Sequence, residues 1–197
     1  MSFFQHVSAL YSAYLSRRPL FTQSATAATL YTAGDVVAQN LAPEDKKYDW
    51  HRTLTMTVIG GCALGPTMAI WYRYLQRRVH LSSKLASTIV QVATDQLVFA
   101  PISIVGLFTL VQLAKATSDN VTERLELARH QVESTFTDVL IQNYKLWPGV
   151  QMVNFFFVPL QYRLLVSNTV AIFWSAYVSM NANKSTEKEP LKTASTN

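Results

Sequence analysis

Cysteine is almost absent from this chain of 197 residues, in which Cys62 is the single example. One cysteine excludes an intrachain disulfide and a cysteine-based metal cluster. Four histidines are scattered through the predicted ends and loops without the spacing of metal ligands: His6, His51, His80 and His130. We therefore predict no metal site, and we interpret the cysteine as a small apolar packing residue.

The sequence also lacks the short signatures of common enzymes. It has no G-x-x-x-x-G-K-S/T phosphate loop, no G-x-G-x-x-G, no G-x-S-x-G elbow and no H-E-x-x-H motif. No residue stands out as a nucleophile with a base to activate it. We expect no catalytic residue and no cofactor, and an enzyme is the least favoured of three functional classes.

Charged residues are scarce, at 15% of the chain against about 25% in soluble domains. Three long windows, 53–72, 96–114 and 164–183, contain no charged side chain at all. Each approaches the roughly 20 residues that a helix needs to cross a bilayer. The window 22–41 is a weaker candidate because it holds Asp35. The chain is predicted to be all-α, a polytopic transmembrane helical bundle with four spans.

The net charge of +5 follows membrane topology and does not indicate a nucleic-acid partner. With four spans, the two ends and the loop 73–87 share one side and carry nine basic and two acidic residues. The loops 42–52 and 115–145 on the other side carry seven basic and eight acidic residues. Basic residues favour the cytoplasmic side or its organellar equivalent, so both termini are expected there.

The predicted organisation is a single membrane domain over residues 1–183, followed by a disordered polar tail, 184–197. Two amphipathic helices are expected beside the bundle: an interfacial helix at 3–16 and a loop helix at 118–143, capped by Ser118 or Asp119. The four spans are expected at about 22–41, 53–72, 88–114 and 147–181.

Prolines divide two of these segments. A kink is predicted at Pro101, which would free the carbonyl of Leu97. The last apolar region, 146–183, has 38 residues and would measure about 57 Å as one helix, too long for a simple crossing. We expect this region to be a helix broken at Pro159, and five crossings remain the alternative.

Polar and ionisable side chains inside apolar spans are the candidate functional residues, because such groups are unfavourable in hydrocarbon. The candidates for a pore lining or polar core are Asp35, Gln39, Asp95, Gln96, Gln151, Asn154, Arg163 and Asn168. The charges of Asp35, Asp95 and Arg163 could balance as a buried acid–arginine arrangement. Two interpretations stay open: a structural core that fixes helix register, or the lining of a hydrophilic path.

A pattern near the C-terminal end then suggests a family. Trp147, Pro148, Gln151, Asn154, Phe155, Pro159 and Arg163 form W-P-x-x-Q-x-x-N-F-x-x-x-P-x-x-x-R. This pattern resembles the signature of the Mpv-seventeen family, also called the twenty-two-kilodalton peroxisomal membrane protein family. Gly34-Asp35 with Gln39 and Asp95-Gln96 before Pro101 match it too. The fungal mitochondrial Sym-type branch is the most similar.

The resemblance implies a four-helix protein of the mitochondrial inner membrane, with the peroxisomal membrane as the alternative. It also implies channel-like permeability to small polar or anionic metabolites or ions, with roles in metabolite and nucleotide homeostasis, mitochondrial DNA maintenance and stress tolerance. Pro101, Trp147, Pro148 and Pro159 are the expected hinge or signature positions. The expected partners are the lipid bilayer and, in a homo-oligomer, further copies of the chain. The alternative is a non-conducting scaffold or assembly factor.

Overall fold

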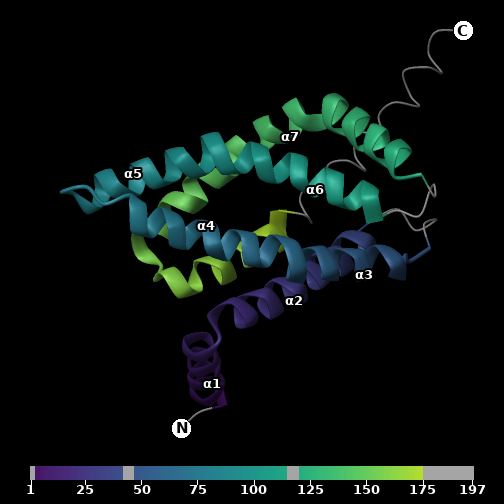
Figure 1. Cartoon of the computed structure of the whole chain (residues 1–197). Coiled ribbons are helices and arrows are strands. Elements are labelled where there is room, and N and C mark those ends of the chain that lie inside the picture. The colour runs from purple at the N-terminus through teal and green to yellow at the C-terminus, as the bar shows by residue number, and fades with distance from the viewer. Residues whose placement is uncertain (1–2, 42–46, 115–119, 175–197) are drawn as a thin grey trace, which may run out of the picture. The chain divides into compact units, whose positions relative to one another are not determined.

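The computed structural model describes residues 3–41, 47–114 and 120–174, and every regular element in these ranges is a helix (Figure 1). The all-α prediction is thereby confirmed for this part of the chain. The chain divides into two compact units. We call residues 1–66 with 168–197 the N-terminal unit and residues 67–167 the central unit. The predicted tail and the end of the last predicted span lie outside the described residues.

The N-terminal unit is built around α2. Its elements are α1 (Phe3–Arg17), α2 (Pro19–Asn40), α3 (Trp50–Val58) and the π-helix η1 (Ile59–Leu64). Pro19 ends the first helix and begins the second, since a proline at the first helical position loses no hydrogen bond. α2 then packs against α1, α3 and η1.

The central unit contains most of α4 (Gly65–Arg78) together with the next five elements. These are α5 (Lys84–Thr94), the π-helix η2 (Asp95–Phe99), α6 (Ala100–Ala114), α7 (Val121–Phe157) and the 3-10 helix η3 (Leu160–Tyr162). Residues 163–167 are helical again. α7 lies along α5 and α6, as Figure 1 shows. Ser83 caps α5 by accepting a hydrogen bond from the Ala86 amide, so this helix begins a turn before the predicted start at 88.

Two continuous helices, Trp50–Arg78 and Lys84–Ala114, are long and apolar enough to cross a membrane. They contain the predicted spans 53–72 and 88–114. Only 6% of the most apolar stretch of the second helix is buried within the protein. A core helix of a soluble protein would be largely buried, so this exposure favours contact with lipid. Among the described residues, α2 and the last apolar region do not meet the same criteria.

Both long helices widen just before a proline. η1 precedes Pro66 and η2 precedes Pro101, and in each the closing amide bonds to the carbonyl five residues earlier. Proline cannot donate to the carbonyl four residues before it, and its ring would collide with that carbonyl in a regular helix. A wide turn relieves this conflict. At Pro101, where the sequence predicts a kink, the structure therefore has a π-helical turn.

α7 differs from its predicted form in two ways. It is capped by Asn120, whose Oδ1 accepts from the Thr122 amide, rather than by Ser118 or Asp119. It also continues through Pro148 to Phe157, so the predicted separation of a loop helix at 118–143 from a span at 147 is wrong. Packing against α5 and α6 compensates for the single hydrogen bond that Pro148 removes.

The predicted break at Pro159 is confirmed, because α7 ends two residues before it. Val158 has φ −89° and ψ 126°, the extended conformation that the residue preceding a proline prefers. η3 follows directly and leads into the helical residues from 163 onward. This turn brings the side chain of Arg163 back to the end of α7.

Candidate functional site

The Asp95 carboxylate is the centre of a buried polar cluster in the central unit. Asp95 is only 2% exposed. Its Oδ1 accepts a hydrogen bond from Trp71 Nε1 at 2.8 Å, and its Oδ2 accepts from Gln96 Nε2 at 2.8 Å and from Gln151 Nε2 at 3.0 Å. No ion pair to Asp95 is present in the described part of the chain. Within that part, the carboxylate is therefore compensated by neutral donors alone.

Gln151 and Asn154 extend the cluster along one face of α7, because residues three apart on a helix are neighbours. Gln151 Nε2 also donates to Tyr72 Oη at 2.9 Å. Asn154 is fully buried, and its Nδ2 lies 3.1 Å from Gln151 Oε1, 3.0 Å from Ser167 Oγ and 3.2 Å from the Arg163 carbonyl. The cluster thus links α4, η2, α7 and the helical residues after η3. We call Trp71, Tyr72, Asp95, Gln96, Gln151, Asn154 and Ser167 the Asp95 cluster.

Arg163 does not pair with Asp95, which corrects the predicted acid–arginine arrangement. Its Nε donates to the Val158 carbonyl at 3.1 Å and its Nη2 to the Phe155 carbonyl at 2.9 Å. The last carbonyls of a helix have no intrahelical partner, and a cation there is favoured by the helix dipole. Arg163 therefore satisfies the end of α7. Its Nη1 is buried and has no hydrogen-bond partner among the described residues.

Asp35 belongs to a separate cluster in the N-terminal unit, where it pairs with Arg52. Arg52 Nε lies 2.8 Å from Asp35 Oδ1, and Asp35 Oδ2 accepts from Gln39 Nε2 and Thr53 Oγ1, each at 2.7 Å. Gln39 also accepts from the Asp49 amide at 2.7 Å. This second cluster ties the end of α2 to the start of α3. The predicted contact between Asp35 and Gln39 is confirmed.

Breaking the Asp35–Arg52 pair should lower stability modestly. The Asp35 side chain is 3% exposed and that of Arg52 is 50% exposed, so solvent screens part of the attraction. We expect Arg52→Met to lower the free energy of unfolding by about 1 kcal/mol. Thermal unfolding in detergent, followed by circular dichroism, would measure the change. Arg129→Met is the matched control, because its pair with Glu133 is exposed on both sides and should contribute nothing measurable.

The structure thus sorts the eight predicted polar candidates into groups. Asp95, Gln96, Gln151 and Asn154 come together in the Asp95 cluster. Arg163 adjoins the cluster, because its backbone carbonyl accepts from Asn154. Asp35 and Gln39 form the second cluster. Asn168 is buried in the N-terminal unit, and its Nδ2 has no partner among the described residues.

Sequence reasoning missed five residues that complete these clusters: Trp71, Tyr72, Ser167, Arg52 and Thr53. Trp71 and Tyr72 were missed because their position near the end of a span fits an aromatic belt at the membrane interface. A buried indole or phenol also needs a polar partner, which the belt interpretation leaves out. One signal was available for Arg52, because Asp49 and Arg52 stand at the expected opening of the second span.

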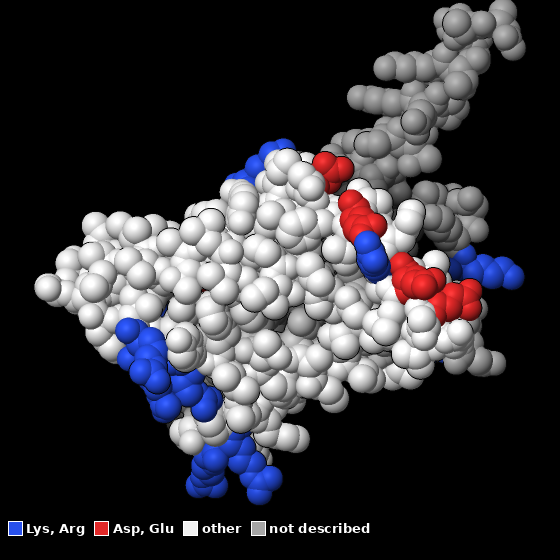
Figure 2. Space-filling model, turned by 45° about the horizontal axis from the view of Figure 1, so that its top comes forward, with Lys and Arg blue, Asp and Glu red and all other residues white. Residues whose placement is uncertain are grey.

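Charge separates the two ends of the central unit. The C-terminal half of α4 holds Arg73, Arg77 and Arg78, and α5 begins with Lys84, so this end is basic. The first half of α7 holds the acids Glu123, Glu126, Glu133 and Asp138. In Figure 2 the acidic side chains gather at one end of the view, with basic ones among them, and a larger group of basic side chains lies at the other end. This asymmetry agrees with the charge pattern that predicts the topology.

Comparison with known proteins now identifies the family. Residues 122–179 match the model of the Mpv17 / PMP22 family. Protein SYM1 of Gibberella zeae is 41% identical over 172 residues, which cover 86% of this chain and 93% of that protein. Protein SYM1 of Saccharomyces cerevisiae is 33% identical over 187 residues, covering 91% of this chain and 92% of that protein. The mitochondrial inner membrane protein Mpv17 of Xenopus laevis is 36% identical over 177 residues, which cover 89% of this chain and 96% of that protein.

No solved structure matches this chain. The relatives cover almost its whole length, and several carry the inner mitochondrial membrane in their names. The chain therefore belongs to the Mpv17 / PMP22 family and is a helical protein of the mitochondrial inner membrane.

Proposed function

We propose that the protein is a channel-like protein that lets small polar or anionic metabolites or ions cross the inner membrane. The observation that carries the proposal is the Asp95 carboxylate, buried between apolar helices without a cation among the described residues to neutralise it. An ionisable group in such surroundings is energetically unfavourable, and in membrane segments such residues usually mark a polar path or a proton or ion route. Arg163 is compensated in a similar way, since its side chain donates to carbonyl oxygens and not to a carboxylate.

The proposed path follows the polar side chains of the Asp95 cluster within the central unit. Gln151 and Asn154 offer amide groups that can turn and exchange hydrogen bonds as a solute passes, which suits selective but weak binding. The proposed topology retains four crossings, with α2 and the last apolar region as the additional spans. A single bundle of four helices encloses little space, so we propose that conduction requires self-association of the chain.

Efflux from liposomes tests the proposal. Purified protein in vesicles loaded with radiolabelled succinate should release the anion while inulin, a large neutral marker, is retained. Asp95→Asn should increase succinate release several-fold, because it removes a negative charge from the path while Gln96 and Gln151 can turn their amides to accept from the new side chain.

Asp138→Asn is the control for that substitution. Asp138 is exposed on α7, outside the cluster, and the variant should behave as the wild type. Equal release from protein-containing and empty vesicles would refute conduction.

A non-conducting scaffold is the second candidate, and one observation favours it. The first turns of α7 leave Val121, Leu125 and Leu127 at least 45% exposed between charged neighbours, as a docking helix would. In that case the Asp95 cluster serves to fix helix register by hydrogen bonds. Intact folding with no efflux would favour this candidate over the channel.

A further inference from the structure

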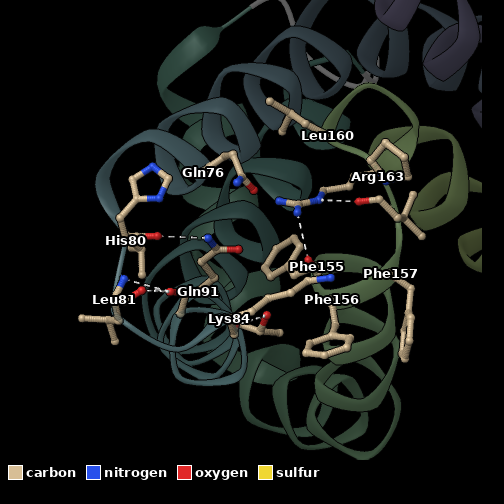
Figure 3. A pocket seen from close by; sticks show the side chains of 15 residues that line it. Gln76, His80, Leu81, Lys84, Gln91, Phe155, Phe156, Phe157, Leu160 and Arg163 are labelled. Carbon is tan, nitrogen blue, oxygen red and sulfur yellow. Dashed lines mark hydrogen bonds between the residues drawn. The ribbon is translucent and has the colours of Figure 1, made fainter.

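A pocket opens at the basic end of the central unit, where α4 ends, α5 begins and α7 ends. Its volume is about 550 Å³. Figure 3 shows its two kinds of wall. One is apolar, formed by Phe155, Phe156 and Phe157, and the other is polar, formed by the side chains Gln76, His80, Lys84, Gln91 and Arg163. None of the described residues that line it is acidic.

Arg163 lines this pocket and has one donor without a partner among the described residues. The side chain is only 5% exposed, and its Nε and Nη2 are engaged by the Val158 and Phe155 carbonyls. The remaining Nη1 is buried without a partner among the described residues. In Figure 3 this free end of the guanidinium points towards Gln76, whose Oε1 is likewise buried and without a partner in that part of the chain. A buried charged donor without an acceptor is unfavourable, and a bound anion would satisfy it.

Lys84 supplies a second cation to the polar wall of the pocket. Its Nζ lies 4.4 Å from the centroid of the Phe156 ring, a contact that leaves its three N–H donors available to an anion. The hydroxyl groups nearby are already used: Ser87 Oγ bonds to the Ser83 carbonyl and Thr88 Oγ1 to the Lys84 carbonyl. The two cations therefore supply the charged donors that face the pocket, with His80 beside them.

From this arrangement we infer that the pocket binds a phosphate group attached to an apolar moiety. The several oxygens of a phosphate can accept from two cations in one pocket, and the three phenylalanines would receive the apolar part. Basic pockets at the end of membrane helices hold phospholipid headgroups by the same chemistry. The ligand is thus either an anionic phospholipid or a soluble phosphate ester. The inference does not depend on conduction, because a non-conducting protein would bind as well.

Two probes distinguish these sources in the full-length protein. Isothermal titration with phenyl phosphate at constant ionic strength tests a soluble ester. Native mass spectrometry of protein released from phosphatidylcholine nanodiscs, with or without phosphatidylglycerol, counts retained anionic lipid. Binding of phenyl phosphate assigns the pocket to soluble esters, and retention of phosphatidylglycerol alone assigns it to lipid. Absence of both would overturn the inference.

Three variants test whether the named side chains bind. Lys84→Gln should weaken whichever probe binds by about tenfold, the usual effect of losing one charge-assisted hydrogen bond. Arg77→Gln removes an equal charge from an exposed position outside the pocket and should change binding by less than about twofold. Gln76→Glu places a carboxylate beside Arg163 Nη1 and should abolish binding while the protein stays folded. Equal losses in Lys84→Gln and Arg77→Gln, or undiminished binding in Gln76→Glu, would show that no such site exists.

Discussion

Replacing Gly60 by alanine should destabilise the N-terminal unit by about 1–3 kcal/mol, the range for overpacking a tight interface. A Cβ atom on Gly60 would lie 2.7 Å from both Cβ and Cγ of Tyr31, closer than carbon atoms approach one another. Tyr31 Cβ is bonded directly to the backbone of α2, so it cannot move aside without shifting the helix. Small residues let membrane helices approach closely, and the contact of α2 with η1 depends on this one.

Thermal unfolding in detergent would measure the effect, with Gly106→Ala and Gly149→Ala as controls. A Cβ at either control position meets no atom within 4 Å. Both glycines lie inside helices, where alanine is intrinsically favoured by up to about 1 kcal/mol. The two kinds of variant should therefore change stability in opposite directions. A Gly60→Ala protein as stable as the controls would contradict the close packing of α2 and η1.

Replacing Gln151 by leucine should destabilise the central unit by about 2–3 kcal/mol. The substitution removes the donor to Asp95 and Tyr72 and the acceptor for Asn154, three hydrogen bonds at a position only 3% exposed. Hydrogen bonds between membrane helices average about 0.6 kcal/mol and reach about 1.7 kcal/mol. The expected loss of stability is larger than these averages, because one of the acceptors that loses a donor is the Asp95 carboxylate.

Gln142→Leu provides the matched control on the same helix, since Gln142 is exposed and should tolerate leucine with little change. A double-mutant cycle with Asp95→Asn adds a sharper test. If Gln151 acts mainly by solvating the Asp95 charge, then Gln151→Leu should be less damaging in the Asp95→Asn background, with a coupling of about 1 kcal/mol. Additive effects would mean that the two residues contribute independently.

The sequence was sufficient for the helical class and for the two helices that are long and apolar enough to cross a membrane, because uncharged windows of about 20 residues are typical of membrane helices. It also placed the break in the last apolar region correctly at Pro159, where a local signal exists. It failed at α7, where the pattern predicts a loop helix at 118–143 separate from a span that begins at 147. The tertiary packing of a long helix outweighed one lost hydrogen bond there, and local patterns do not reveal such packing.

Partner choice among the polar residues was the least predictable feature. The sequence contains two acids and one arginine within apolar segments, and pairing them was the simplest balance of charge. In the structure Asp35 instead pairs with Arg52, and Asp95 accepts hydrogen bonds from three neutral donors. Arg163 donates to carbonyl oxygens at the end of α7. Helix ends and indole donors compete for charged groups, and their positions are known only once the fold is known.

Single-channel recording in planar bilayers is the direct test of a polar path past Asp95 and Arg163. The protein should show reproducible conductance across a salt gradient, absent from controls without protein. The reversal potential should move towards anion preference in Asp95→Asn and towards cation preference in Arg163→Gln, because each removes one fixed charge from the path. Folded wild-type protein without conductance would contradict such a path, as would conductance whose ion preference neither substitution changes.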